Sequence, residues 1–224
     1  MMVDAAARAP RLPRRDDAAR ARLAAVASAR TPIVLARDRA LTVPGPLAAA
    51  VPSLTRGSAV VVGGELGAGA TSAVLGLAAA ATAAGEWAAM IDGQASLGGL
   101  AAAEAGVDLA RFAVVREVPR ERWATVVAAL MDGMTVVIAE LPRHLRVGDA
   151  RRLVARARER AAVLVALTPD VRAWPAEASV RVEARGGEWA GLGSGDGVLT
   201  GRVARWEVTD RGRPPQLVHA AAVG

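Results

Sequence analysis

The sequence contains no cysteine, no tyrosine and no lysine, and Phe112 is its single phenylalanine. Without cysteine, the chain has no disulfide, no thiolate nucleophile and no zinc site of the cysteine type. Without lysine, it cannot form a Schiff base. Histidine is scarce as well: His144 and His219 are the only two and lie far apart, so we expect no metal site built on histidine.

The missing lysine has a simple compositional explanation. GC-rich coding DNA raises arginine and alanine together, and all 28 residues of the Lys+Arg class are arginines here. This bias accounts for the composition as a whole. It does not account for an absent lysine at a position where chemistry requires one.

Size and charge set the next limits. The chain has 224 residues and 53% hydrophobic content, much of it alanine, which predicts a core of small side chains. The net charge of +6 divides into +5 over residues 1–40, −4 over 41–140 and +5 over 141–224. Basic ends indicate a partner surface or nucleic acid, and a solvated arginine face explains the same pattern. DNA contact therefore stays open.

Long apolar runs are missing too. None approaches the ~20 residues that a membrane-spanning helix requires. The N-terminal stretch lacks the apolar centre of a secretory signal. We therefore expect a cytoplasmic protein with no membrane segment.

From Ser58 onward, short apolar strands alternate with alanine-rich helices. Continuous apolar runs are typical of strands buried on both faces, and strand–helix alternation predicts crossovers within a mostly parallel sheet. The expected strands cover 59–62, 88–92, 112–115, 135–139 and 163–167, and the expected helices cover 71–84, 97–105, 120–131 and 149–161. We expect Asp149 to cap the last of these helices.

The pattern changes after Pro175. Residues 179–183 alternate between apolar and polar side chains, as a half-buried strand does. We expect a glycine-rich loop over Gly186–Gly197, followed by strands at 198–209 and 216–221 that complete an antiparallel extension.

The whole pattern predicts an α/β fold, with a mostly parallel central sheet flanked by helices. We expect a single domain over 41–224. A basic N-terminal segment, 1–40, precedes it, with one helix near 16–29 and a short strand at 32–35.

A glycine-rich segment, GGELGAGATS over residues 63–72, follows a buried strand and opens a helix. Its spacing fits the phosphate-binding pattern G-x-x-x-x-G-K-[ST], with Gly64 and Gly69 as the glycines and Thr71 and Ser72 after them. The lysine position is Ala70, which cannot reach or neutralise a phosphate. Backbone amides remain, so weak residual ATP binding and a loop without any ligand both stay open.

The order of segments resembles the core of RecA, the strand-exchange ATPase. Residues 54–64 resemble the stretch leading into its phosphate loop, and 89–97 (AMIDGQASL) resemble the strand and turn with its catalytic glutamate. Residues 105–108 (AGVD) resemble the segment that follows, and 136–140 resemble its magnesium-site strand. The similarity covers about residues 40–220 and implies a RecA-like core.

The departures from that pattern affect separate parts of the ATPase machinery. The position of the catalytic glutamate is Gln94, which cannot take a proton from water. The position of the magnesium-site aspartate is Glu140, and that of the nucleotide-sensing glutamine falls near Thr168. The two loops that bind DNA in RecA are also cut down here. Together with Ala70, these changes predict a chain without ATP hydrolysis and without a required cofactor.

A small RecA-like protein with eroded ATPase elements resembles the ImuA group, including its ImuA-prime branch. The resemblance implies an accessory factor of DNA-damage-induced mutagenic translesion synthesis. It implies an ImuB-like polymerase-fold partner and, through it, an error-prone replicative-type polymerase. Two other functions stay open: an active RecA/RadA-like DNA-dependent ATPase, and a SulA-like cell-division inhibitor.

Two sets of side chains are candidates for partner binding. Arg152, Arg156 and Arg160 recur every four residues on one helix, which indicates either a basic stripe or a solvated face on which Arg156, Glu159 and Arg160 pair. Trp174 and Trp189 lie in expected loops, where exposed tryptophans often anchor interfaces. The alternative for both is that they cover an edge of the small-residue core. We expect Trp123 in the core and Trp206 half-buried. The N-terminal helix is a further candidate, for self-association or for docking on another protein.

Overall fold

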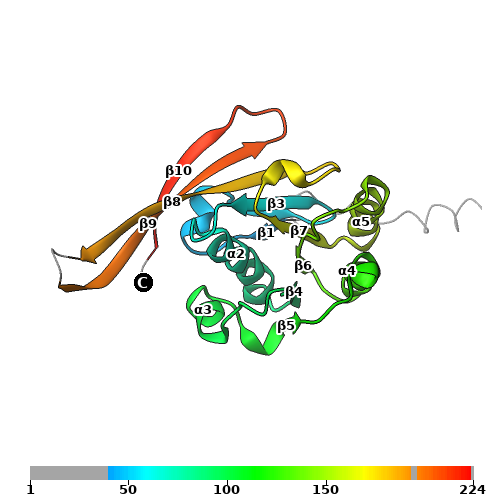
Figure 1. The fold of residues 1–224 in the computed structure, drawn as a ribbon, viewed down its shortest axis with the longest axis horizontal. Coiled ribbons are helices and arrows are strands. Elements are labelled where there is room, and N and C mark those ends of the chain that lie inside the picture. Colours follow the sequence, from blue (N-terminus) through cyan, green and yellow to red (C-terminus); the bar gives the residue numbers. More distant parts are fainter. Residues whose placement is uncertain (1–39, 193–195, 223–224) are drawn as a thin grey trace, which may run out of the picture. The chain divides into compact units, whose positions relative to one another are not determined.

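The computed structural model describes residues 40–192 and 196–222 (Figure 1). The predicted N-terminal helix and the strand at 32–35 lie outside these residues. The fold is built on one eight-stranded sheet in the order β10-β9-β8-β3-β7-β6-β4-β5. Its parallel half consists of β3 (Ala59–Gly64), β7 (Val163–Thr168), β6 (Val136–Glu140), β4 (Ala88–Ile91) and β5 (Phe112–Val115). The α/β prediction with a mostly parallel sheet is confirmed.

The central strands of the parallel half are buried on both faces. Val60, Val61 and Val62 of β3 have no more than 1% of their surface exposed, although their side chains alternate between the two faces. Both faces must therefore be covered by helices, which explains why these strands are continuously apolar in the sequence.

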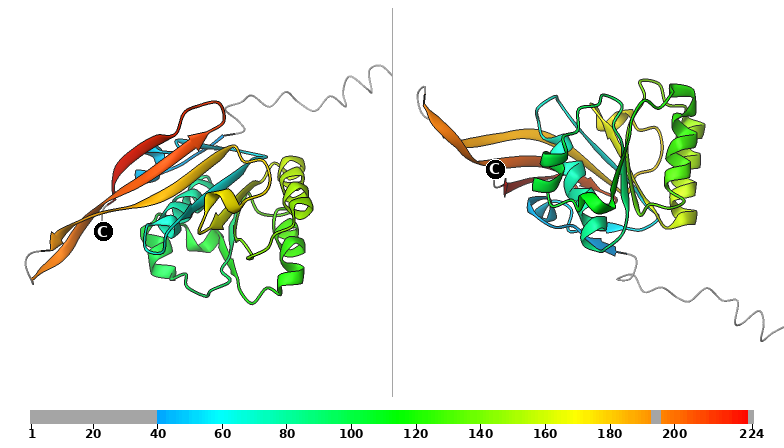
Figure 2. Two further views of the ribbon diagram at one scale, coloured as in Figure 1. Left: turned by 45° about the horizontal axis from the view of Figure 1, so that its top comes forward. Right: turned by 90° about the horizontal axis from the view of Figure 1, so that it is seen from below.

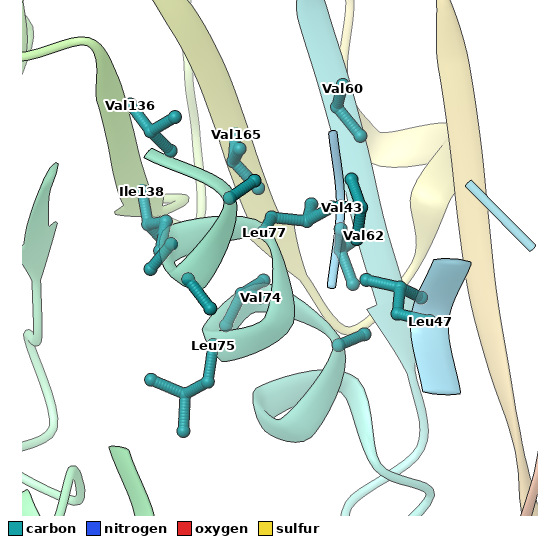
Figure 3. Close-up of a cluster of buried hydrophobic side chains, with 14 of the residues drawn as sticks. Val43, Leu47, Val60, Val62, Val74, Leu75, Leu77, Val136, Ile138 and Val165 are labelled. Carbon is teal, nitrogen blue, oxygen red and sulfur yellow. The ribbon is translucent and has the colours of Figure 1, made fainter. Parts of the chain in front are cut away.

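One face is covered by α2 (Ala70–Ala83) and the short α3 (Gly99–Glu104) (Figure 1). Figure 3 shows Val74 and Leu77 of α2 beside Val62 and Val165 of the sheet. The alanines over 78–81 are almost fully buried, so α2 is enclosed on more than its sheet-facing side. Small side chains allow this close packing, as the alanine-rich composition predicted.

The opposite face is covered by α4 (Trp123–Leu130) and α5 (Val147–Arg160). Trp123 and Val127 of α4 are buried in this second core, and so is Leu153 of α5. The helix α5 begins two residues before its expected start, and its N-cap is Arg146. The expected cap Asp149 is therefore wrong: this residue lies in the first turn, where its charge favours the helix dipole.

A small antiparallel ribbon was not predicted from the sequence. It pairs β1 (Ala40–Thr42) with β2 (Ser53–Thr55), and a 3₁₀ turn over Pro46–Ala49 lies between them. Leu41 and Leu47 are buried against the core on the α2 side. The ribbon thus closes one side of the helix layer.

The antiparallel extension consists of β8 (Val180–Leu192), β9 (Gly197–Asp210) and β10 (Gln216–Ala222). β8 runs parallel to β3 over residues 180–184, and beyond them it pairs with β9 alone. The expected glycine-rich loop is therefore wrong over 186–192, which belong to β8, and at Gly197, which begins β9. The two strands run past the sheet as a two-stranded ribbon (Figures 1 and 2).

The glycines of this ribbon have a steric role. A Cβ on Gly187 would lie 2.3 Å from the carbonyl oxygen of Val203, and one on Gly191 would lie 2.0 Å from that of Val198. Glycine here permits close strand pairing, whereas the composition alone suggested a turn. Within residues 40–192 and 196–222, no helix has the length and apolar character needed to cross a membrane.

Candidate functional site

The glycine-rich loop lies where the sequence predicted it, between the end of β3 and the start of α2. Gly67 and Gly69 have φ of 80° and 105°, values that favour glycine, and Gly69 is the N-cap of α2. Gly64 has φ of 142°, and a Cβ there would lie 2.5 Å from the carbonyl oxygen of Ala184 in β8. The loop is therefore built into the sheet at one end and into the helix at the other.

The residues at the lysine and hydroxyl positions face different surroundings. Ala70 is partly buried and packs against the core beneath α2. Thr71 and Ser72 are exposed in the first turn of that helix. The exposed part of the loop carries Glu65 and Leu66, a carboxylate and a fully exposed apolar side chain. Neither of these side chains favours a phosphate.

A hollow beside the loop is lined by charged side chains that are already paired. Arg172 pairs with Asp170 at 3.0 Å, and Arg185 pairs with Glu183 at 2.9 Å. Glu65 adds a further carboxylate to the lining. The acidic lining residues outnumber the basic ones. The negative charges of a nucleoside triphosphate would therefore be repelled from this hollow.

The other two ATPase positions come together at the same edge of the sheet. Glu140, at the end of β6, accepts a hydrogen bond from the amide of Gly93 at 2.9 Å. Gln94 follows Gly93 in the turn after β4 and is exposed. The phosphate loop begins at the end of β3, which β7 separates from β6. The parallel sheet thus places all three predicted positions on one edge, with the loop set apart from the other two.

Asp92 is the buried carboxylate of this edge, with none of its side chain exposed. Its oxygens accept hydrogen bonds from the amides of Ser96 and Leu97 at 3.0 and 3.2 Å, and from Nε of Arg116 at 3.1 Å. Burial alone would raise its pKa, but these donors outweigh burial, and the pKa lies below its ordinary value. Asp92 is therefore ionised and fixes the turn after β4 by accepting hydrogen bonds from its backbone amides.

Glu140 behaves in the opposite way. Burial raises the pKa of its carboxyl group, the amides of Gly93 and Gln94 partly offset this, and the nearby charge of Asp92 adds to the rise. Both carboxylates accept hydrogen bonds from backbone amides of the turn. Within 40–192 and 196–222, no three His, Asp or Glu side chains gather in a way that could hold a metal ion.

The arginine stripe on α5 is largely paired within the protein. Arg152 lies 3.7 Å from Asp149, and Arg160 lies 3.1 Å from Asp132. Arg156 contacts Asp132 at 2.7 Å and Glu159 at 2.9 Å. The expected pairing of Arg156 with Glu159 is confirmed, whereas Arg160 pairs with Asp132, outside α5.

The tryptophans divide between core and surface. Trp174 was a candidate interface anchor, with covering of the core as the alternative. Only 2% of its surface is exposed, and its indole N–H donates to the carbonyl of Glu177 at 3.2 Å, so Trp174 belongs to the core. Trp206 was expected half-buried and is buried. Trp123 is in the core, as predicted. Trp189 is 53% exposed, but it lies in strand β8 and was wrongly placed in a loop.

One loop contact was not found from the sequence. Arg202 of β9 donates from Nη2 to the carbonyl of Ala68 at 2.9 Å. The two residues are 134 positions apart, and nothing in the pattern around Arg202 marks it among 28 arginines. Arg116, the partner of Asp92, was missed for the same reason.

Comparisons with known proteins support this fold. A protein-family model described as "MT3502 N-terminal domain" matches residues 47–176. "Uncharacterized protein Rv3395c" of Mycobacterium tuberculosis is 37% identical over 153 residues, which are 65% of this chain and 71% of that protein. The crystal structure of the RadB recombinase superimposes with a TM-score of 0.54 at 14% identity, over 80% of this chain and 94% of that chain. The fold is therefore RecA-like.

Proposed function

This chain belongs to the MT3502 N-terminal domain family, and we propose that it is a non-catalytic RecA-like adaptor in DNA-damage-induced mutagenic translesion synthesis. It would act in the cytoplasm and bind an ImuB-like polymerase-fold protein. Through that protein it would join an error-prone replicative-type polymerase. The family assignment and the RecA-like fold are the premises, and the adaptor role rests on the chemistry of the sheet edge.

The observation that carries the proposal is the state of the phosphate loop. The lysine position is an alanine packed on the core, and the loop surface carries Glu65. Arg202 contacts the loop by donating a hydrogen bond to the carbonyl of Ala68. A P-loop ATPase needs a cation that contacts the terminal phosphates in the transition state.

The positions of the general base and the metal ligand support the same proposal. Gln94 has no basic oxygen strong enough to activate water. Glu140 is held by backbone amides of the neighbouring turn. Three separate groups that ATP hydrolysis requires are replaced or engaged elsewhere. A change of function explains this better than a change in the mechanism of hydrolysis.

An exposed apolar ribbon is the surface we assign to partner binding. Trp189 and Val198 are 53% and 77% exposed, and Leu199 and Val203 are also exposed on β9. Exposed tryptophan and aliphatic side chains on one ribbon are typical of interfaces. The paired arginines of α5 are weaker candidates because their charges are already neutralised within the protein.

ATP hydrolysis by the purified full chain tests the non-catalytic part. We expect no turnover above background, with or without single-stranded DNA. Turnover well above background, together with micromolar binding of Mg-ATP that Thr71→Ala abolishes, would support an active RecA/RadA-like ATPase instead.

A binding experiment tests the adaptor part separately. We expect the chain to capture an ImuB-like protein, with weaker capture by Trp189→Ala than by the control Trp87→Ala, because Trp87 is also 46% exposed but lies outside the ribbon. Capture of a tubulin-like division protein in its place would favour a SulA-like inhibitor.

A further inference from the structure

Arg202 occupies a narrow place between the ribbon and the phosphate loop. Its guanidinium lies 5.1 Å from the centre of the Trp189 ring, and its Nη2 donates to the carbonyl of Ala68 at 2.9 Å. Its partners in the described part of the chain are thus an aromatic ring and a backbone carbonyl. This arginine therefore joins β9 to the loop.

Two glycines make room for this side chain. A Cβ on Gly69 would lie 2.9 Å from Nη2 of Arg202, and one on Gly187 would lie 3.1 Å from its Nε. The Nε atom itself is buried without a hydrogen-bond partner among the described residues. The guanidinium is therefore enclosed by backbone on two sides and by an indole ring.

The ribbon needs such an attachment beyond the core. Ala204 and Trp206 of β9 are buried on the α2 side, but further along the same strand Val198 is 77% exposed. Beyond Ala184, β8 pairs with β9 alone, and β9 pairs with β10 only as far as Arg202. The part of the ribbon beyond Arg202 is therefore two-stranded, and isolated two-stranded ribbons are only marginally stable in water. Arg202 lies at the transition between these two parts, where the core ends and the free ribbon begins.

We propose that the phosphate loop serves in this protein as the anchor of the β8–β9 ribbon, with Arg202 as the strap. The guanidinium of Arg202, from the distant strand β9, binds the carbonyl of Ala68 in the loop. The strap sets the position of Trp189 and of the ribbon that carries it. Because coupling between two sites is reciprocal, a change in the loop moves the ribbon, and a partner on the ribbon affects the loop.

Hydrogen exchange of the full chain measures the strap directly. We expect Arg202→Ala to speed amide exchange at least tenfold over residues 187–203, with the central strands β3 and β7 unchanged. The matched control is Arg205→Ala, on the opposite face of β9 and 3.8 Å from Glu188, which should leave this exchange unaltered. Exchange over 187–203 within twofold of wild type in Arg202→Ala would overturn the proposal.

A second pair of variants approaches the strap from the loop. Gly69→Ala places a methyl group against the guanidinium, whereas Gly67→Ala has the same left-handed backbone problem but no atom within 4 Å of its Cβ. We expect only Gly69→Ala to speed exchange over 187–203. Equal effects of the two variants on the ribbon would show that the loop does not anchor it. This test requires neither nucleotide nor partner, so its outcome is independent of the adaptor role.

Discussion

The parallel half and the antiparallel extension of the sheet solve the burial problem differently. In the parallel half, helices cover both faces, and side chains such as Val61 and Val137 have no exposed surface. In the extension, only the α2 side near the sheet is covered, and the ribbon beyond it exposes Trp189 and Val198. The apolar residues of the first region stabilise the fold by being buried. Those of the second region are exposed at the surface, where a partner can contact them. We therefore expect partner binding on the ribbon, which no helix in the described part of the chain covers.

The largest expected difference between the two regions concerns their tryptophans. Trp174→Ala removes a buried indole from the second core, and we expect a loss of about 4 kcal/mol in the free energy of unfolding. Trp189→Ala removes an exposed ring and its contact with Arg202, for a loss of about 1 kcal/mol or less. Urea denaturation measures both values. Equal losses would contradict the distinction between core and ribbon.

Asp92 should show the next largest effect. Asp92→Asn removes a buried charge that three donors satisfy, and we expect a loss of about 3 kcal/mol at pH 7. Because the folded pKa of Asp92 is lowered, its contribution is present above the unfolded value of 3.8 and is lost as the pH falls through the folded pKa. The difference in the free energy of unfolding between wild type and Asp92→Asn should therefore become smaller below about pH 4.

Glu140→Gln is the control for this pH dependence. The folded pKa of Glu140 is raised, so its ionised form is disfavoured in the folded state, and this cost disappears below its unfolded pKa of 4.5. Wild type should therefore gain stability relative to Glu140→Gln as the pH falls. The same pH trend in both variants would show that the assigned environments are wrong.

The smallest of the three effects concerns the junction between the regions. Gly64→Ala would push a methyl group into the carbonyl of Ala184 in β8, and we expect a loss of about 2 kcal/mol. Gly67→Ala should cost about 1 kcal/mol from backbone strain alone, since its Cβ meets nothing within 4 Å. The difference in melting temperature between the two variants isolates the contact between β3 and β8. Equal melting temperatures of the two variants would mean that β3 and β8 move apart at no cost in stability to accommodate the methyl group.

Much of the parallel half was predictable because its signals are local. The run at 59–62 and the glycines after it identify a buried strand and a tight turn without reference to any other segment. The predicted helix at 71–84 matches α2 within one residue at each end. The strands at 112–115 and 163–167 were also placed correctly. A fully buried strand has the same pattern whichever neighbour it pairs with.

The errors fall where the pattern depends on a distant partner. Gly187 and Gly191 are typical of a loop by composition, yet they lie in a strand because β9 approaches them closely. Trp174 is buried because it packs into the core beside α5, and no local signal distinguishes it from exposed Trp189. The β1–β2 ribbon was missed because each of its strands has only three residues.

The sequence by itself determined the α/β class, the position of the phosphate loop and the loss of its lysine at Ala70, because each of these depends on neighbouring residues or on residue type alone. Only the tertiary structure decided that Asp92 and Glu140 brace one turn, and that Arg202 crosses 134 positions to bind the loop. The physical reason is range: propensity and periodicity act over a few residues, whereas a hydrogen bond between strands depends on how the whole sheet is assembled.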